Sequence, residues 1–192
     1  MHKEFDQLWI LNDEVSKDLT IINNAIKAAV VVIIFKNTEG QSVLYLIERN
    51  TYDGHHSGQM ALPGGKMDHV DANLSETALR EVHEEIGVIL ESDQLFPLTP
   101  QWIHVSNHWV QPFYTIVYEK PIFTLNKREI NRIFEIPLAF FKQKESLDYH
   151  ELEFMKEKII APRYYYESEE IWGATALIIY QFIKLIDSKL KN

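Results

Sequence analysis

The sequence predicts a single domain of the α/β or α+β class, in which buried strands pack against at least two helices. Two runs rich in β-branched residues, Lys27–Phe35 and Val43–Glu48, are typical of buried strands. An acidic, periodic segment from Asn73 to Gly87 and a mostly apolar segment that ends near Leu190 are typical of helices. The 192 residues contain no repeat, low-complexity tract or linker, so we expect one hydrophobic core.

The composition limits the compartment and the partners of this chain. It has no cysteine, which fits a reducing compartment, and its first residues lack the basic start and apolar core of a secretory signal. The longest apolar run, Ala28–Phe35, is too short to cross a bilayer. The formal net charge of −9 argues against nucleic acid as a partner, because contact with phosphate backbones needs an excess of Lys and Arg. We therefore expect a cytoplasmic protein that binds neither membranes nor nucleic acid.

An amphipathic helix is predicted at the amino terminus, within residues 1–24. Its apolar residues recur at roughly helical spacing: Leu8, Leu11, Val15 and Leu19. We expect this helical extension to pack on the domain formed by residues 25–192, without a role in chemistry.

The domain is predicted to begin with a strand pair, in which a turn at Asn37–Gln41 joins the two β-branched runs. A polar loop then carries the adjacent histidines His55 and His56. Neighbouring side chains in an extended loop point apart, and no further His or Cys stands nearby at zinc-ligand spacing, so we do not expect a zinc site. Residues Gln59–Leu62 are predicted to form a short strand.

Further strands are predicted after the acidic helix. Leu95–Trp102 and Val110–Tyr118 alternate apolar and polar residues, and a tyrosine-rich strand is expected near Lys158–Tyr166. The last helix is apolar over most of its circumference, so we expect it to pack on a sheet rather than lie in solvent.

The acidic helix carries three carboxylates on one face. At about 100° per residue, Glu81, Glu84 and Glu85 share an arc, with Arg80 at its edge. Like charges at this spacing destabilise a helix by roughly 0.2 to 0.5 kcal/mol per pair, so the arrangement favours a bound cation. Oxygen ligands without Cys or His beside them suit Mg²⁺ or Mn²⁺. The alternative interpretation is a solvated acidic face in which Glu76 pairs with Arg80.

A glycine turn and a polar loop precede this helix. Gly64 and Gly65 allow a ligand to approach the backbone closely. Asn73 and Glu76 have the spacing of a capping box, and Gly87 is a predicted helix stop. The sequence therefore predicts a loop, a helix and a second loop, with the carboxylates aimed one way.

This segment resembles the signature of the Nudix hydrolases, metal-dependent enzymes that split a diphosphate linked to another moiety. The signature is Gly, five residues, Glu, seven residues, then Arg-Glu-apolar-any-Glu-Glu-any-Gly-apolar. Its first position matches Gly65, and its second half matches the following residues: Arg80, Glu81, Val82, Glu84, Glu85, Gly87 and Val88. Asp71 departs from it, because it stands where the first Glu belongs and the segment between it and Arg80 is one residue longer. This departure puts a functional role of Asp71 in doubt.

The coenzyme A pyrophosphatase branch of the family resembles the chain over a longer stretch. Its members tend to carry His-x-Gly-Gln-x-x-x-Pro-Gly-Gly, then two Asp residues before Thr-Ala-Leu-Arg-Glu. The matching positions here are His56, Gly58, Gln59, Pro63, Gly64, Gly65, Asp68, Asp71 and the run Thr77-Ala78-Leu79-Arg80-Glu81. A run near the carboxy terminus also resembles this branch: Ile171-Trp172-Gly173-Ala174-Thr175-Ala176.

The resemblance implies an α/β fold, a single Nudix domain with a mixed β-sheet sandwiched between α-helices. It implies hydrolysis of coenzyme A or acyl-coenzyme A with Mg²⁺ or Mn²⁺, giving 4′-phosphopantetheine, or its acyl form, and adenosine 3′,5′-bisphosphate. Two alternatives stay open. One is a Nudix hydrolase of ADP-ribose, a dinucleotide or a nucleoside triphosphate. The other is a module that binds a nucleotide without cleaving it, although such a module is expected to have a damaged acidic helix.

The resemblance also assigns roles to residues. The expected metal ligands are Glu81, Glu84, Glu85 and the carbonyl of Gly65. Arg80 is expected to orient those carboxylates through charge-assisted hydrogen bonds. The expected substrate-binding residues are Arg49, His56, Gln59 and Gly64.

The general base is either Glu129 or one of the helix glutamates. Glu129 stands in a stretch that resembles the family, in which an acidic residue precedes an apolar one shortly before a Pro-Leu pair. The alternative for Glu129 is a solvated turn residue beside Lys127 and Arg128.

Overall fold

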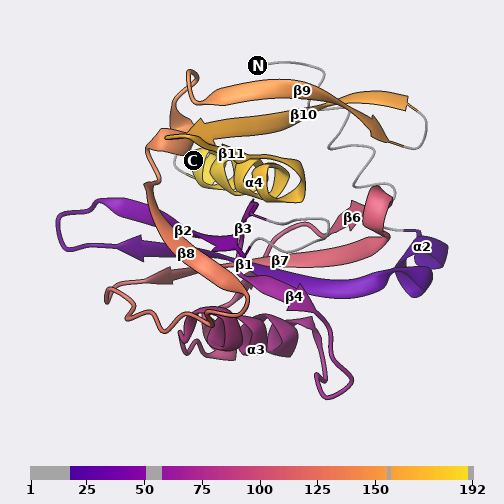
Figure 1. Cartoon of the computed structure of the whole chain (residues 1–192), viewed down its shortest axis with the longest axis horizontal. Helices are drawn as coiled ribbons and strands as arrows, with labels where there is room; N and C mark the ends of the chain where they lie inside the picture. Colours follow the sequence, from indigo (N-terminus) through magenta and orange to yellow (C-terminus); the bar gives the residue numbers. More distant parts are fainter. Residues whose placement is uncertain (1–17, 51–57, 155–156, 190–192) are drawn as a thin grey trace.

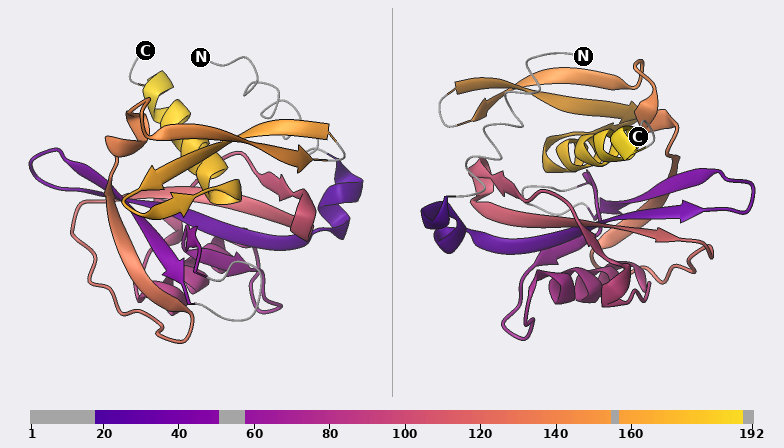
Figure 2. Two further views of the ribbon diagram at one scale, coloured as in Figure 1. Left: turned by 45° about the horizontal axis from the view of Figure 1, so that its top comes forward. Right: turned by 180° about the vertical axis from the view of Figure 1, so that it is seen from behind.

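Two helices enclose a mixed β-sheet in the computed structural model, which describes residues 18–50, 58–154 and 157–189 (Figure 1). Helix α3 (Leu74–Ile86) covers one face of this sheet, and helix α4 (Gly173–Lys189) covers the other. A second, smaller sheet lies on the far side of α4, so the layers run helix, sheet, helix, sheet (Figure 2). This arrangement confirms the predicted α/β fold with a mixed sheet between helices.

The large sheet has eight strands in the order β3-β2-β1-β7-β5, with β8 paired to β2, β4 to β1 and β6 to β7. Strands β1 and β7 run parallel, and the other pairs formed by these described strands are antiparallel. The strands span β1 Ile26–Lys36, β2 Ser42–Arg49, β3 Met60–Ala61, β4 Gly64–Lys66, β5 Phe96–Pro97, β6 Gln101–Ile103, β7 His108–Val117 and β8 Ile130–Pro137.

Strand β1 lies in the middle of the sheet because both of its faces are apolar. Successive side chains of a strand point to opposite faces. Val32 and Ile34 belong to the core between the sheet and α4, whereas Val31 and Ile33 belong to the core between the sheet and α3. A strand covered on both faces needs a continuous apolar run, which is the pattern that this segment has.

Helix α3 begins and ends at the predicted residues. The side chain of Asn73 accepts the N–H groups of Ser75 and Glu76, each at 3.0 Å, and Gly87 ends the helix with a φ of +73°. The predicted capping box is wrong in one detail. The Glu76 carboxylate accepts the N–H of Ala72 at 2.9 Å, which is one residue before the cap. Both Asn73 and Glu76 therefore accept backbone hydrogen bonds at the start of the helix.

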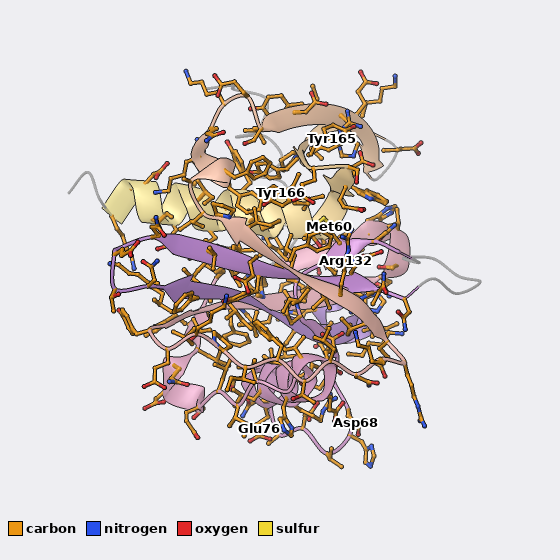
Figure 3. The ribbon with its side chains drawn as sticks, turned by 60° about the vertical axis from the view of Figure 1, so that its left-hand side comes forward. Met60, Asp68, Glu76, Arg132, Tyr165 and Tyr166 are labelled. Atoms are coloured by element: carbon orange, nitrogen blue, oxygen red, sulfur yellow. The ribbon has the colours of Figure 1, made fainter. Side chains whose placement is uncertain are left out.

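Helix α4 is apolar on most sides because it lies between two sheets. Its Ile178, Ile179 and Phe182 belong to the core that also contains Tyr164 and Ile171 of the second sheet. That sheet has the order β11-β10-β9, with β9 Leu147–Phe154, β10 Glu157–Tyr166 and β11 Glu169–Ile171. Figure 3 shows Tyr165 and Tyr166 on this sheet, at the opposite end of the molecule from Asp68 and Glu76 beside α3. The prediction that this helix packs on a sheet is confirmed.

Several strands differ from the prediction. Strands β4, β8, β9 and β11 are not predicted, and the strand expected at Leu95–Trp102 is two short strands, β5 and β6, which both pair with β7. Pro100 lies in the interruption between them, and proline has no N–H to donate to a neighbouring strand. Short 3₁₀ helices complete the described fold: η1 Ser92–Gln94, η2 His104–Ser106 and η3 Phe140–Lys142.

Helix α2 (Leu19–Asn24) is the described part of the predicted amino-terminal extension. The Asp18 carboxylate caps it and accepts the N–H of Thr20 at 2.8 Å. Residues 1–17 of the extension, and the loop with His55 and His56, lie outside the described residues. Among the helices of the described ranges, none is long and apolar enough to cross a membrane.

Candidate active site

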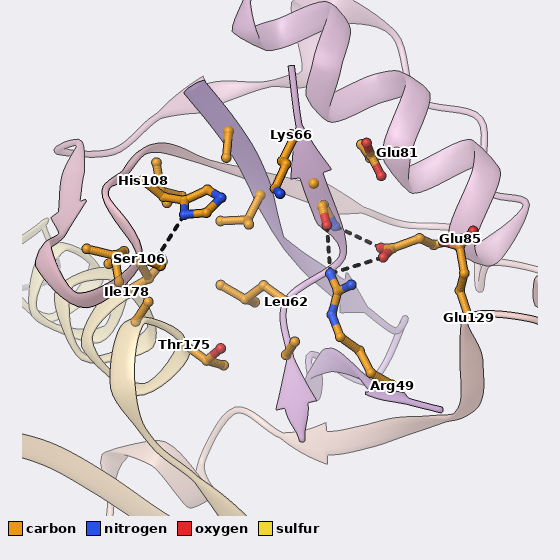
Figure 4. Close-up of a pocket in the computed structure, with 18 residues that line it drawn as sticks. Arg49, Leu62, Lys66, Glu81, Glu85, Ser106, His108, Glu129, Thr175 and Ile178 are labelled. Carbon is orange, nitrogen blue, oxygen red and sulfur yellow. Dashed lines mark hydrogen bonds and ion pairs between the residues drawn. The ribbon is translucent and has the colours of Figure 1, made fainter. Parts of the chain in front are cut away.

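A pocket of about 670 Å³ lies between β1, β4, the acidic face of α3 and the start of α4 (Figure 4). Its volume is typical of sites that bind small molecules. Glu81, Glu85, Arg49 and Glu129 line one end of it. The structure therefore brings the acidic helix together with two residues that are distant in the sequence.

Glu85 is the most buried charged group at the acidic end, with 1% of its surface exposed. Its Oε2 accepts the N–H of Gly64 at 2.8 Å, and its Oε1 accepts a hydrogen bond from Nη2 of Arg49 at 3.3 Å. The same Nη2 donates to the Gly64 carbonyl at 3.0 Å, which closes a triangle of three residues. Burial raises the pKa of Glu85 to about 7, and the nearby charges of Glu81 and Glu129 act in the same direction, whereas Arg49 and the Gly64 N–H oppose it.

The two glycines before the loop are required for close packing. Residues Gly64–Lys66 form β4, which pairs with β1, so the expected glycine turn is in fact a short strand. A Cβ on Gly64 would lie 2.2 Å from the carbonyl oxygen of Ala29, and the φ of Gly64 is +145°. A Cβ on Gly65 would lie 2.5 Å from the carboxylate of Glu81. The side chain of Glu81 therefore rests directly on the backbone of β4.

Arg80 uses all five of its N–H donors. Its Nε and one Nη2 proton donate to the carboxylate of Asp71, at 2.9 Å each. The other Nη2 proton donates to the Lys66 carbonyl at 3.0 Å. Its Nη1 donates to Glu81 at 2.9 Å and to Glu84 at 3.2 Å. Arg80 thus connects the loop after β4 to two carboxylates of the helix.

Asp71 is the buried anchor of this arrangement. In addition to Arg80, its Oδ2 accepts the Thr77 hydroxyl and the Asp68 N–H, each at 2.9 Å. The hydrogen bond from Arg80 and these further donors hold the pKa of Asp71 well below its usual range, although burial opposes them. The position that departs from the Nudix signature therefore holds Arg80 in place.

The three helix carboxylates differ in their surroundings. Glu81 and Glu85 line the pocket, whereas Glu84 does not, and the Glu84 side chain is 54% exposed. Burial raises the pKa of Glu81, although the hydrogen bond from Arg80 opposes this shift. The shared face predicted from the sequence is therefore divided into a buried part and a part at the surface.

Strand pairing brings Arg49 and Glu129 beside Glu85. The register of β2 against β8 shifts between Glu48 and Arg49, so that Arg49 pairs with Ile130. The N–H of Asn50 then donates to the Glu129 carbonyl at 2.7 Å. In Figure 4, Arg49 and Glu129 lie on either side of Glu85. This irregularity at the end of the strand is how two residues far apart in the sequence come to line one wall.

Of the other expected substrate-binding residues, Gly64 lines the pocket and Gln59 does not. The Gln59 carbonyl accepts the N–H of Arg49 at 3.2 Å, so it supports the strand that carries Arg49. His56 lies outside the described residues.

The donor chemistry of the acidic end fits a hard divalent cation. Within residues 18–50, 58–154 and 157–189, no group of three or more His, Asp or Glu side chains is arranged to hold an ion as it stands. However, Glu81 and Glu129 both raise the pKa of Glu85, which is repulsion that a divalent cation would relieve. The second carboxylate oxygens of Glu81 and Glu84 accept no hydrogen bond in this described part, so both remain available to a cation.

The opposite end of the pocket contains residues that the sequence did not indicate as functional. These are Ser106, His108 and Thr175, and Lys66 lies between the two ends. Two had a signal nearby, since Lys66 follows Gly65 directly and Thr175 lies in the Ile171–Ala176 run. No pattern marked Ser106 or His108, which reach the pocket through a turn between β6 and β7.

Comparison with known proteins points to one family. A family model described as the NUDIX domain matches residues 26–157. A Yersinia enterocolitica protein named "Uncharacterized Nudix hydrolase NudL" is 35% identical over 162 residues, which cover 81% of this chain and 79% of that protein. A protein of the same name from Pectobacterium atrosepticum is 32% identical over 150 residues and 76% of each chain.

The fold also matches solved structures. A crystal structure of a MutT/nudix family protein from Enterococcus faecalis aligns with a TM-score of 0.59 and 16% identity. The alignment covers 97% of this chain and 75% of that one. At this identity, the likeness concerns the fold alone.

Proposed function

This chain belongs to the Nudix hydrolase family, whose members act on nucleoside diphosphate derivatives, and we propose that it hydrolyses the diphosphate bond of coenzyme A or an acyl-coenzyme A. The products are 4′-phosphopantetheine, or its acyl form, and adenosine 3′,5′-bisphosphate. One observation carries the proposal. The acidic helix with its glycines and the start of α4 line the same pocket, although the sequence separates them widely. These are two segments in which the chain resembles the coenzyme A branch.

The residues of the acidic end have distinct proposed roles. Arg80 orients Glu81 and Glu84 through the hydrogen bonds from its Nη1. Arg49 holds Glu85 and provides a positive charge at the pocket wall, where its guanidinium can donate a hydrogen bond to a phosphate oxygen of the substrate.

Glu129 is the general base that the arrangement favours. Both oxygens of Glu85 already accept hydrogen bonds, and Glu84 does not line the pocket. The side chain of Glu129 is exposed and lines the pocket, so it can take a proton from the attacking water on its carboxylate.

A divalent ion completes the proposed site. Mg²⁺ or Mn²⁺ would be held by Glu81, Glu84, Glu85 and the Gly65 carbonyl, and when bound it would neutralise negative charge on the diphosphate oxygens. The three carboxylates, of which Glu85 is buried, contribute the charge and the oxygen ligands that such an ion prefers.

A substrate panel tests the proposal. The purified protein is incubated with Mg²⁺ or Mn²⁺ and, separately, with coenzyme A, ADP-ribose, NADH and a deoxynucleoside triphosphate, and the products are identified by mass spectrometry. We expect preferential release of 4′-phosphopantetheine from coenzyme A. Preferential cleavage of another compound would contradict the coenzyme A assignment and leave the metal site in place. No cleavage of any compound would favour a nucleotide-binding module.

A further inference from the structure

A large part of the pocket lining is aliphatic. We refer to the following residues, which come from the large sheet, the segment after β3 and α4, as the aliphatic wall: Ala28, Val30, Leu62, Ile103, Val110 and Ile178. Four of them belong to one hydrophobic core, and the other two, Val30 and Ile103, pack against it. Val30 and Ile103 are only half-buried. The wall is therefore a continuous surface of the core, part of which a ligand in the pocket can cover.

Strand pairing makes neighbours of these side chains. Ala28 and Val30 are two residues apart on β1, so their side chains point to the same face of the sheet. Val110 of β7 is the register partner of Ala28 and lies in the same core. Ile178 belongs to this core as well and enters it from α4, which covers this face. An apolar group in the pocket thus meets several aliphatic side chains together.

The aliphatic wall begins next to the acidic end of the pocket. Val30 is the register partner of Gly64 on β4. The N–H of Gly64 donates to Glu85, and its carbonyl accepts from Arg49. A Cβ on Gly64 would lie 2.9 Å from Cγ1 of Val30. A diphosphate held at the acidic end therefore has aliphatic surface directly beside it.

The described residues that line the pocket provide little aromatic surface. None of them is Phe, Tyr or Trp, and the imidazole of His108 is the one ring among them. Nucleobases gain free energy of binding by stacking on flat rings, whereas aliphatic groups gain it wherever apolar surface is removed from water. The wall therefore suits an aliphatic group better than a nucleobase.

We propose that the aliphatic wall is the subsite for the pantetheine arm of the substrate, and that the adenosine half extends away from it. This inference rests on the proposed function and deepens it, because it states which half of coenzyme A the pocket recognises. Next to the diphosphate, the arm has a CH₂ group and a quaternary carbon with two methyl groups, which fit against Val30 and its neighbours. The adenosine half begins with a hydroxylated ribose, and ADP-ribose has a ribose on both sides of its diphosphate.

Binding of the two product halves tests this orientation without turnover. Titration calorimetry with Mg²⁺ compares 4′-phosphopantetheine with AMP, which carries the same single phosphate on adenosine. We expect 4′-phosphopantetheine to bind about tenfold more tightly, because burial of two methyl groups contributes about this much. Equal affinities, tighter binding of AMP, or no binding of either compound would overturn the subsite.

Threonine at a wall position provides the second test. Val30→Thr and Ile103→Thr place a hydroxyl in the wall at half-buried positions, so the fold should survive, which circular dichroism melting checks. Each should weaken binding of 4′-phosphopantetheine by about three- to tenfold and leave binding of AMP unchanged. With coenzyme A, KM should rise by the same factor while kcat changes little. Val117→Thr, at a half-buried strand position outside the pocket, is the matched control and should change none of these values.

The outcomes separate this inference from the proposed function. Wall variants that fold and bind 4′-phosphopantetheine as tightly as the Val117→Thr control does would refute the subsite. If 4′-phosphopantetheine binds more tightly than AMP but coenzyme A is not cleaved, the subsite stands and the proposed reaction falls. If coenzyme A is cleaved but the two compounds bind equally, the reaction stands and the subsite falls.

Discussion

The guanidinium of Arg80 and the carboxylate of Asp71 form two parallel hydrogen bonds, from Nε to Oδ1 and from Nη2 to Oδ2, each 2.9 Å long. Asp71 is buried, and its partner extends from there to Glu81 and Glu84. Bidentate pairs of this kind fix orientation as well as adding stability. An aspartate at a position where the Nudix signature has glutamate thus positions the arginine that holds the helix carboxylates.

Replacing Asp71 with Asn should destabilise the protein. The substitution keeps the shape of the side chain and leaves the partly buried guanidinium of Arg80 without its main negative partner. We expect the free energy of unfolding to fall by about 2 to 4 kcal/mol, as measured by urea denaturation at neutral pH. Asp93→Asn is the control, since Asp93 is exposed, and it should change the free energy by less than about 0.5 kcal/mol. Equal effects of the two substitutions would contradict the anchoring role of Asp71.

The contribution of Asp71 to stability should disappear in acid. Its pKa in the folded protein lies below the ordinary value of about 3.9, so the folded state binds fewer protons on this group than the unfolded state does. The stabilisation is therefore fully present above about pH 4 and is lost as the pH falls toward the folded pKa. Unfolding free energies of the wild-type protein and Asp71→Asn should converge between about pH 4 and pH 2. A constant difference over this range would show that ionisation of Asp71 is not the cause.

Ionisation of Glu85 should lower the stability of the metal-free protein as the pH rises, whereas ionisation of Asp71 raises it. The folded pKa of Glu85 is raised to about 7, so the folded state binds more protons than the unfolded state between about pH 4.5 and pH 7. Stability in EDTA should fall as the pH rises through this window, by at most about 3 kcal/mol. Glu85→Gln should remove this dependence, as measured by thermal or urea unfolding at pH 5 and pH 8. If the variant keeps the same slope, another group is responsible.

Alanine at the two neighbouring glycines should give two different results. In Gly65→Ala the three atoms nearest the new Cβ belong to the flexible end of Glu81, so the fold should survive while Glu81 is displaced and turnover falls. In Gly64→Ala the Cβ meets the backbone of Ala29 in a conformation that L-residues rarely adopt, so the protein should be strongly destabilised. Circular dichroism melting and turnover with Mg²⁺ distinguish the two. A Gly65→Ala variant with full activity would argue against the position assigned to Glu81.

Neutral substitutions of the helix carboxylates should separate activity from folding. Glu81→Gln and Glu84→Gln keep the shape and remove a negative charge, so turnover with Mg²⁺ or Mn²⁺ should fall by about 100-fold or more. Removal of the metal with EDTA should abolish the activity of the wild-type protein, and adding Mg²⁺ should restore it. Each variant should melt within a few degrees of the wild-type protein. Near wild-type activity in either variant would make the proposed ligand set wrong.

The sequence by itself determined the local elements of this protein. The β-branched run of β1, the capping residue Asn73 and the stop at Gly87 act through propensity and backbone conformation, which depend on neighbouring residues. The same holds for the shared helix face of Glu81 and Glu85, because helical periodicity places it. The strands β9 and β11 are not recognisable in the sequence, since their patterns acquire meaning only when both pair with β10 and the sheet packs on α4.

Only the tertiary structure decided which of these residues meet. Glu84 and Glu85 are neighbours in sequence, yet one is exposed and the other is buried against β4. Arg49, Glu129 and Thr175 enter one pocket through a register shift, a strand end and a helix packed between two sheets. Burial, charge and pKa depend on these long-range contacts, because the surroundings of a side chain are made by distant segments that local propensity does not place.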